Sequence, residues 1–105
     1  SLRKENLERA KEMSLKSNQL APGQSSFQDT YAWILYELGQ FEEANEWIDK
    51  ALQSDGKSPV LLEHKGDILY RLGKQDEAVQ YWEKAKANGS DSNDLDKKIE
   101  LKKIP

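Results

Sequence analysis

The chain lacks cysteine altogether and has a single histidine, His64. Without cysteine it can form no disulfide bond, no thiolate nucleophile and no cysteine-ligated zinc site. With one histidine and no cysteine, neither a two-histidine metal site nor a Cys–His catalytic pair can be assembled within one chain. The composition therefore excludes several common kinds of active site, and it leaves the redox state of the compartment open.

An excess of basic charge and long apolar runs are also absent. The formal net charge at pH 7 is -3, and lysine and arginine are scattered among glutamate and aspartate. No basic field is present to attract nucleic acid or anionic lipid, so we expect no nucleic-acid partner. No apolar run approaches the ~18 residues of a membrane span, so we expect no direct membrane insertion of this segment. Hydrophobic residues make up 36% of the chain, which favours a layered, elongated structure over a compact ball.

Motifs for catalysis and for cofactor binding are missing as well. Neither the GxGxxG pattern nor the P-loop spacing occurs. Glu63, His64 and Asp67 lie within one helical turn, but a His–Asp pair alone supplies too few ligands for a metal ion. A surface histidine flanked by carboxylates is the favoured interpretation. We therefore expect no enzyme activity and no cofactor, and the sequence indicates no metal site.

What the chain does contain is one stretch that occurs nearly twice. Ile34–Ala44 reads ILYELGQFEEA, and Ile68–Ala78, 34 residues later, reads ILYRLGKQDEA. When Ser25–Ser58 is placed over Pro59–Ser92 without a gap, the identities continue in the same register at Lys50/Lys84, Ala51/Ala85 and Ser58/Ser92. This register indicates two copies of one structural unit.

Each unit is predicted to form two helices. In the first helix of the first unit, apolar residues recur at three- and four-residue steps, namely at Phe27, Tyr31, Ile34, Leu35 and Leu38. Ser25 with Gln28 predicts a capping box at the start of this helix, and Gly39 predicts its end. In the second unit, Ser58-Pro59 predicts a capped helix start and Asn88-Gly89 a helix end.

Small residues recur where the two helices of a unit would cross. Ala44, Ala51, Ala78 and Ala85 stand on the inner stripe of the second helices. A larger residue there would overpack the contact, at a cost of about 1–3 kcal/mol. The aromatic ring of Trp82 on the same stripe is predicted to pack between helices.

The 34-residue helix–turn–helix period resembles the tetratricopeptide repeat (TPR). The resemblance is carried by Gly66, Gly39/Gly73, Ala44/Ala78, Ile48/Trp82 and Ala51/Ala85. Three residues depart from the TPR pattern. Gln28 in the first unit and Leu62 in the second replace the Trp of the pattern, and Ala32 replaces the glycine of the first unit. The resemblance implies an all-α fold, a right-handed superhelical array of antiparallel helix pairs (a TPR-like α-solenoid).

The amino-acid sequence of the repeats is also similar to that of bacterial multi-repeat TPR proteins, including envelope-associated lipoproteins. The similarity lies in FQDTYAWILYELG and EHKGDILYRLG, within residues 27–87. It implies a location in the bacterial periplasm or envelope if the parent protein carries a lipoprotein signal, and a cytoplasmic location otherwise.

The TPR frame also predicts how the whole chain is divided. Residues 1–24 are predicted to be helix B of an incomplete unit, residues 25–58 and 59–92 to be two complete units, and residues 93–105 to be a C-terminal capping helix. Leu7, Ala10, Ser14 and Ser17 take the helix-B positions of the incomplete unit. In the capping helix, Leu95 and Ile99 are predicted to face inward, and lysines of its C-terminal half favour the helix dipole. We expect all of this to be one domain, excised from a longer protein.

In TPR proteins the first helix of each unit lines a concave face that commonly holds an extended peptide or a partner helix. The resemblance therefore implies a non-enzymatic scaffold module that binds a protein or peptide. The candidate residues on this face are Asp29, Trp33, Tyr36 and Glu37 from the first unit, and Glu63, His64, Asp67, Tyr70 and Arg71 from the second. The aromatic residues would supply contact area, and the carboxylates would select a basic or polar partner rather than a carboxylate tail.

Two alternatives stay open from the sequence. Trp33 and Tyr36 could simply pack against the first helix of the next unit. The segment could also be purely architectural, stacking on neighbouring repeats or self-associating without binding a peptide.

Overall fold

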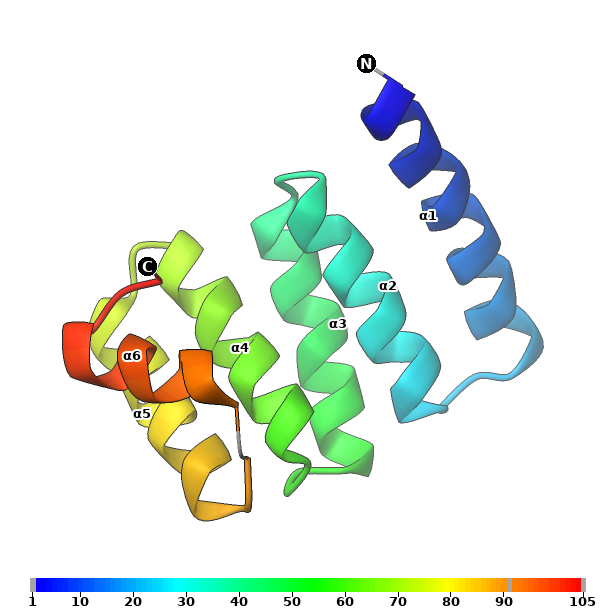
Figure 1. The fold of residues 1–105 in the computed structure, drawn as a ribbon. Helices are drawn as coiled ribbons and strands as arrows, with labels where there is room; N and C mark the ends of the chain where they lie inside the picture. The colour runs from blue at the N-terminus through cyan, green and yellow to red at the C-terminus, as the bar shows by residue number, and fades with distance from the viewer. Residues whose placement is uncertain (1, 91, 105) are drawn as a thin grey trace.

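The computed structural model describes residues 2–90 and 92–104, and every regular element in these ranges is an α-helix. The helices are α1 (Leu2–Leu20), α2 (Ser25–Glu37), α3 (Phe41–Ser54), α4 (Pro59–Arg71), α5 (Gln75–Ala87) and α6 (Asn93–Leu101). Each helix packs against the next one along the chain, from α1 at one end of the array to α6 at the other (Figure 1). The predicted all-α array of antiparallel helix pairs is confirmed.

The same turn joins the two helices of each pair. Gly39 and Gly73 have φ angles of 81° and 82°, a left-handed conformation that glycine adopts without steric cost. After each glycine, a backbone N–H reaches back to close the helix, from Gln40 to the Leu35 carbonyl and from Lys74 to the Leu69 carbonyl, both at 2.9 Å. This is the Schellman arrangement, and it confirms the helix end predicted at Gly39.

Two apolar clusters form the core. The first joins α2 and α3 to α4, and the second joins α4 and α5 to α6. The four alanines that repeat along α3 and α5 are all 0% exposed, as the crossing of the paired helices requires. Trp82 is also fully buried, which confirms its predicted place between helices.

The two predicted helix starts have different outcomes. The Ser58 hydroxyl oxygen accepts a hydrogen bond from the Leu61 backbone N–H at 3.4 Å, with Pro59 at the first helical position, so this prediction is confirmed. The predicted capping box of Ser25 and Gln28 is wrong. Ser25 already lies inside α2, Gln24 is the N-cap, and no side chain caps this end. With Gln24 as the N-cap, Gln28 is the fourth helical residue rather than the third, and its side chain is buried, at 8% exposure.

The two end helices are held in different ways. On α1 the buried residues are polar, Ser14 and Asn18, whereas Leu20 is 88% exposed. On α6, Leu95 is buried and Ile99 packs against the second cluster, which confirms that both face inward. The division into units at 1–24, 25–58, 59–92 and 93–105 remains a prediction, and Ser1, Asp91 and Pro105 lie outside the described residues. Within the ranges 2–90 and 92–104, no helix is both long enough and apolar enough to span a membrane.

Candidate functional site

The candidate residues lie on α2 and α4, the first helices of the two pairs. Because α2 and α4 contact each other directly, side chains from successive pairs meet on one surface. We call this surface the α2–α4 face and define it by Asp29, Trp33, Tyr36, His64 and Arg71. All five side chains are at least partly exposed.

Three rings stack across this face. The Trp33 ring lies between Tyr36 and His64, with ring centroids 4.5 Å from Tyr36 at 11° and 4.2 Å from His64 at 24°. Trp33 therefore does pack against the first helix of the next unit, as one of the two alternatives supposed. It stays only half-buried, however, so part of the ring remains exposed.

Hydrogen bonds at both ends hold the stack in place. His64 Nδ1 lies 2.6 Å from Asp29 Oδ1, a contact between α4 and α2. At the other end, Arg71 Nε donates to the Tyr36 hydroxyl oxygen at 3.0 Å. This hydrogen bond raises the pKa of the Arg71 guanidinium above its ordinary value, so the group is fully charged at neutral pH. The rings are thus held in position by hydrogen bonds within the chain.

The remaining candidate residues are engaged elsewhere. Glu37 pairs with Arg3 of α1 at 3.0 Å, at an exposed site. Tyr70 lies 6.0 Å from the buried Trp82, measured between ring centroids. Glu63 binds Lys98 of α6 at 2.9 Å. These three residues flank the α2–α4 face and are not part of its ring stack.

Asp67 is the candidate that the structure removes from the accessible surface. It is 5% exposed, and its Oδ1 accepts hydrogen bonds from Lys98 Nζ at 2.9 Å and from Trp82 Nε1 at 3.0 Å. Burial raises the pKa of its carboxyl group, while Lys98 and Trp82 act in the opposite direction. Asp67 therefore anchors α6 to the second helix pair, and we leave it out of the candidate site. The side chain of His64, three positions earlier on α4, contacts Asp29 of α2.

Lys98 is the partner that the sequence interpretation missed. The sequence analysis assigns it only a favourable interaction with the helix dipole, yet it is 8% exposed and lies between Asp67 and Glu63. A signal for this was present, because Lys98 directly precedes Ile99 and follows Leu95 by three positions. A lysine at that spacing shares the inward face of the helix.

The comparisons with known proteins agree with this architecture. The tetratricopeptide repeat model matches residues 27–58 and 61–87, which is more than half of the chain. A chain in a structure of Naa15/Naa10 bound to HypK-THB superposes with a TM-score of 0.78 over 91% of this chain, at 21% sequence identity. The match covers only 15% of that larger chain, so it shows a shared fold and nothing of the larger protein's activity.

No curated protein matches the sequence. The similarity to bacterial envelope lipoproteins is not supported by these comparisons, and neither is a bacterial origin. The family model that matches describes a repeat and not an enzyme. With its antiparallel helix pairs, its repeated glycine turns and this match, the chain belongs to the tetratricopeptide repeat family.

Proposed function

We propose that this chain is a non-enzymatic scaffold module that binds a protein or peptide on its α2–α4 face. The observation that carries the proposal is the stack of Tyr36, Trp33 and His64 across two successive helix pairs. A family of repeats that generally serves protein interaction supports the same class of function.

The chemistry of the face favours such a partner. Half-exposed aromatic rings that are already fixed in position offer contact area at little further cost in side-chain entropy. Asp29 and Arg71 stand at opposite ends of the stack, so hydrogen-bonding groups of both signs border the rings. An extended segment lying along the rings could bury an apolar side chain on Trp33 and direct polar groups to either end.

Selection of peptides followed by substitution tests the proposal. A phage-displayed library of random linear peptides is selected on the purified chain, and the affinity of a selected peptide is measured by titration calorimetry. We expect Trp33→Ala to weaken binding by roughly 2 kcal/mol, as for a central aromatic residue of an interface. Tyr81→Ala is the matched control, since Tyr81 is a partly buried aromatic residue on α5 rather than on α2 or α4.

Circular dichroism of both variants separates lost binding from lost folding. Equal affinity for the original chain and for the folded Trp33→Ala variant would contradict the proposal. Failure to select any peptide would count against it as well.

A second candidate function, stacking or self-association, has an observation of its own. An apolar hollow lies between α1 and α2, and Met13 and Phe27 on its wall are 70% and 39% exposed. Exposed apolar residues gathered at one place often mark contact surfaces. Sedimentation equilibrium decides between the two: a mass that rises with concentration and returns to the monomer in Met13→Ser favours association through this surface, and a monomer at all concentrations excludes it.

A further inference from the structure

The hollow between α1 and α2 is one of three equivalent grooves in the array. We call it the first groove, and its wall includes Met13, Ser14, Ser17, Phe27, Thr30 and Ile34. One period later the same positions are Trp47, Ile48, Ala51, Leu61, His64 and Ile68. These residues form a second groove, between α3 and α4, which holds α2. A third groove, between α5 and α6, holds α4.

In the second groove, α2 contacts both walls. The Tyr31 ring of α2 packs edge-on against Trp47 of α3, with ring centroids 4.7 Å apart. Ala32 and Leu35 of α2 are fully buried in one apolar cluster with residues of α3 and α4. The groove thus takes up the apolar stripe of an amphipathic helix.

The third groove holds α4 in the same register. Lys98 Nζ of α6 lies 2.9 Å from Glu63 of α4. In the second groove, His64 Nδ1 of α4 lies 2.6 Å from Asp29 of α2. Both contacts join residues 35 positions apart, so the two grooves hold their helices at equivalent positions.

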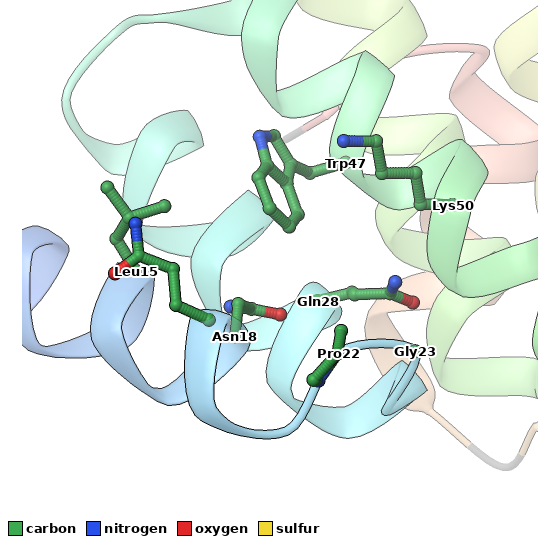
Figure 2. A pocket seen from close by; sticks show the side chains of 8 residues that line it. Leu15, Asn18, Pro22, Gly23, Gln28, Trp47 and Lys50 are labelled. Atoms are coloured by element: carbon green, nitrogen blue, oxygen red, sulfur yellow. The ribbon is translucent and has the colours of Figure 1, made fainter.

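The two walls of the first groove are also joined as in the later units. On the side that faces α3, Asn18 of α1 and Gln28 of α2 line one pocket with Trp47 (Figure 2). One period later, Leu52 of α3 packs against the apolar cluster that contains Leu62 of α4. Helix α1 is therefore seated on α2 as α3 is seated on α4, and the groove on the other side has the same two walls.

The described helices leave the first groove open to solvent. Met13 is 70% exposed and Phe27 is 39% exposed. In the second groove, Trp47 is partly buried at the position of Met13, and Leu61 is 4% exposed at the position of Phe27. The difference in exposure has one cause, because α2 covers the second groove.

We propose that the first groove binds an amphipathic α-helix of a partner protein, laid between α1 and α2 as α2 lies between α3 and α4. The inference goes beyond binding on the α2–α4 face, with which the groove shares no residue. It concerns the hollow of the second candidate function but assigns it an occupant other than a second copy. A second copy has no such helix to offer, because Leu35 of α2 and Leu69 of α4 are already buried within the array.

One position of the wall selects the size of a side chain on the bound helix. In the third groove, Gly66 of α4 lies against Trp82, and an added Cβ atom would overlap that ring. In the second groove the corresponding pair is Ala32 and Ile48, both fully buried. The first groove has only Ser14 at this position. Because the helix residue becomes larger as the wall residue becomes smaller, we expect a residue larger than alanine, such as leucine, opposite Ser14.

The position that selects a charge in the other two grooves is neutral in the first. His64 and Lys98 each bind a carboxylate of the helix in their groove. The corresponding residue of the first groove is Thr30, whose hydroxyl donates to the Ser26 carbonyl oxygen at 2.9 Å. The partner helix is therefore recognised by its apolar side chains, without an ion pair at this position.

The test uses two helical peptides with the sequence of residues 25–38, the helix that the second groove holds. One keeps alanine at position 32, and the other carries Ala32→Leu. A lactam bridge between side chains at positions 26 and 30, both exposed in α2, stabilises the isolated helix, because a helix this short is marginal in water. Met13 is the single methionine of the chain, so its ¹³C-labelled methyl group reports occupancy of the groove as one NMR signal.

We expect both peptides to shift the Met13 methyl signal saturably, and the Leu peptide to bind roughly tenfold more tightly than the Ala peptide. Ser14→Ile imitates the second groove and should reverse this preference, because leucine would then overpack the contact. Phe27→Ser, on the wall, should raise the Kd of the Leu peptide roughly tenfold. Leu20→Ser is the matched control, at an exposed position of α1 outside the wall, and should leave the Kd unchanged.

Circular dichroism checks that each variant is folded. A Met13 signal that neither peptide shifts would overturn the inference. Equal affinities of the two peptides for the original chain, or equal losses in Phe27→Ser and Leu20→Ser, would do so as well. A mass that rises with concentration in the absence of peptide would assign the groove to a second copy and would overturn the choice of occupant. None of these outcomes decides the Trp33→Ala test, so failure here and failure of binding on the α2–α4 face are distinguishable.

Discussion

Gly66 and Trp82 illustrate how single residues adjust to one another inside a repeat. A Cβ atom built on Gly66 would overlap the Trp82 indole ring and lie 3.0 Å from the Ala78 carbonyl oxygen. The ring cannot turn away, because it is fully buried and its Nε1 donates to Asp67. One period earlier the corresponding residues are Ala32 and Ile48. There alanine takes the place of glycine, and isoleucine takes the place of the larger tryptophan.

We predict that Gly66→Ala destabilises the protein by about 1–3 kcal/mol, although alanine is the better helix former, because the new methyl group overpacks the contact with Trp82. The free energy of unfolding in urea measures the loss. In a Trp82→Ile background, which imitates the first unit, the same substitution should cost much less. An equal cost in both backgrounds would show that the ring is not the obstacle.

At the scale of the elements, α6 is attached by one buried charge as well as by apolar contacts. Lys98 Nζ lies 2.9 Å from Glu63 and from Asp67, both on α4. Although burial alone would lower the pKa of Lys98, the two carboxylates raise it above its ordinary value of 10.5. Lys98 is therefore charged at neutral pH and forms an ion pair that joins α6 to α4.

We predict that Lys98→Met lowers the free energy of unfolding by about 3 kcal/mol at pH 7, because it leaves the buried Asp67 carboxylate without its cation. Lys97→Met, at the exposed neighbouring position, is the control and should change the stability by less than about 0.5 kcal/mol.

The same variant tests the pH dependence. A lysine whose pKa is raised on folding contributes stability that is fully present below its unfolded pKa and is lost as the pH rises through its folded pKa. The difference in stability between the original chain and Lys98→Met should therefore be constant from neutral pH to about pH 10 and should shrink above it. A difference that grows with alkaline pH would contradict this assignment.

At the scale of the whole molecule, the array behaves as a row in which each helix is held by its neighbours. The main helix contacts join consecutive elements, with a smaller contact between α2 and α4. None of the buried hydrophobic residues belongs to α1, whose buried residues are Ser14 and Asn18. In such a row the stability is roughly a sum over units and interfaces, so the end with the least apolar burial opens first.

We predict that Ser14→Pro unfolds α1 and leaves the rest of the array folded. Proline in the middle of a helix costs about 3 kcal/mol, which exceeds what a helix without buried apolar residues can offset. Hydrogen exchange should show that the amides of α1 lose protection while those of α4 and α5 keep it. Loss of protection throughout the chain would instead show that α1 is essential to the core.

Much of the fold could be predicted because its signals are local. The 34-residue period, the glycine turns at Gly39 and Gly73, and the alanines at the helix crossings depend only on spacing along the chain. The membership of the α2–α4 face was also accessible in part, since helical periodicity places Asp29, Trp33 and His64 on surfaces that neighbouring units share.

Only the tertiary structure decided which polar groups meet. Asp67 and Lys98 are far apart along the chain. Because of the way α6 is rotated on the second helix pair, Asp67, a candidate binding residue, is buried and binds Lys98 instead. The spacing of Gln28 from Ser25 predicts a capping box. In the structure α1 and α3 enclose the Gln28 side chain, and its Oε1, like Asn18 Oδ1, has no hydrogen-bond partner among the described residues. Periodicity specifies the side of a helix that faces inward, whereas the partner found there depends on how the helices are rotated and spaced against one another.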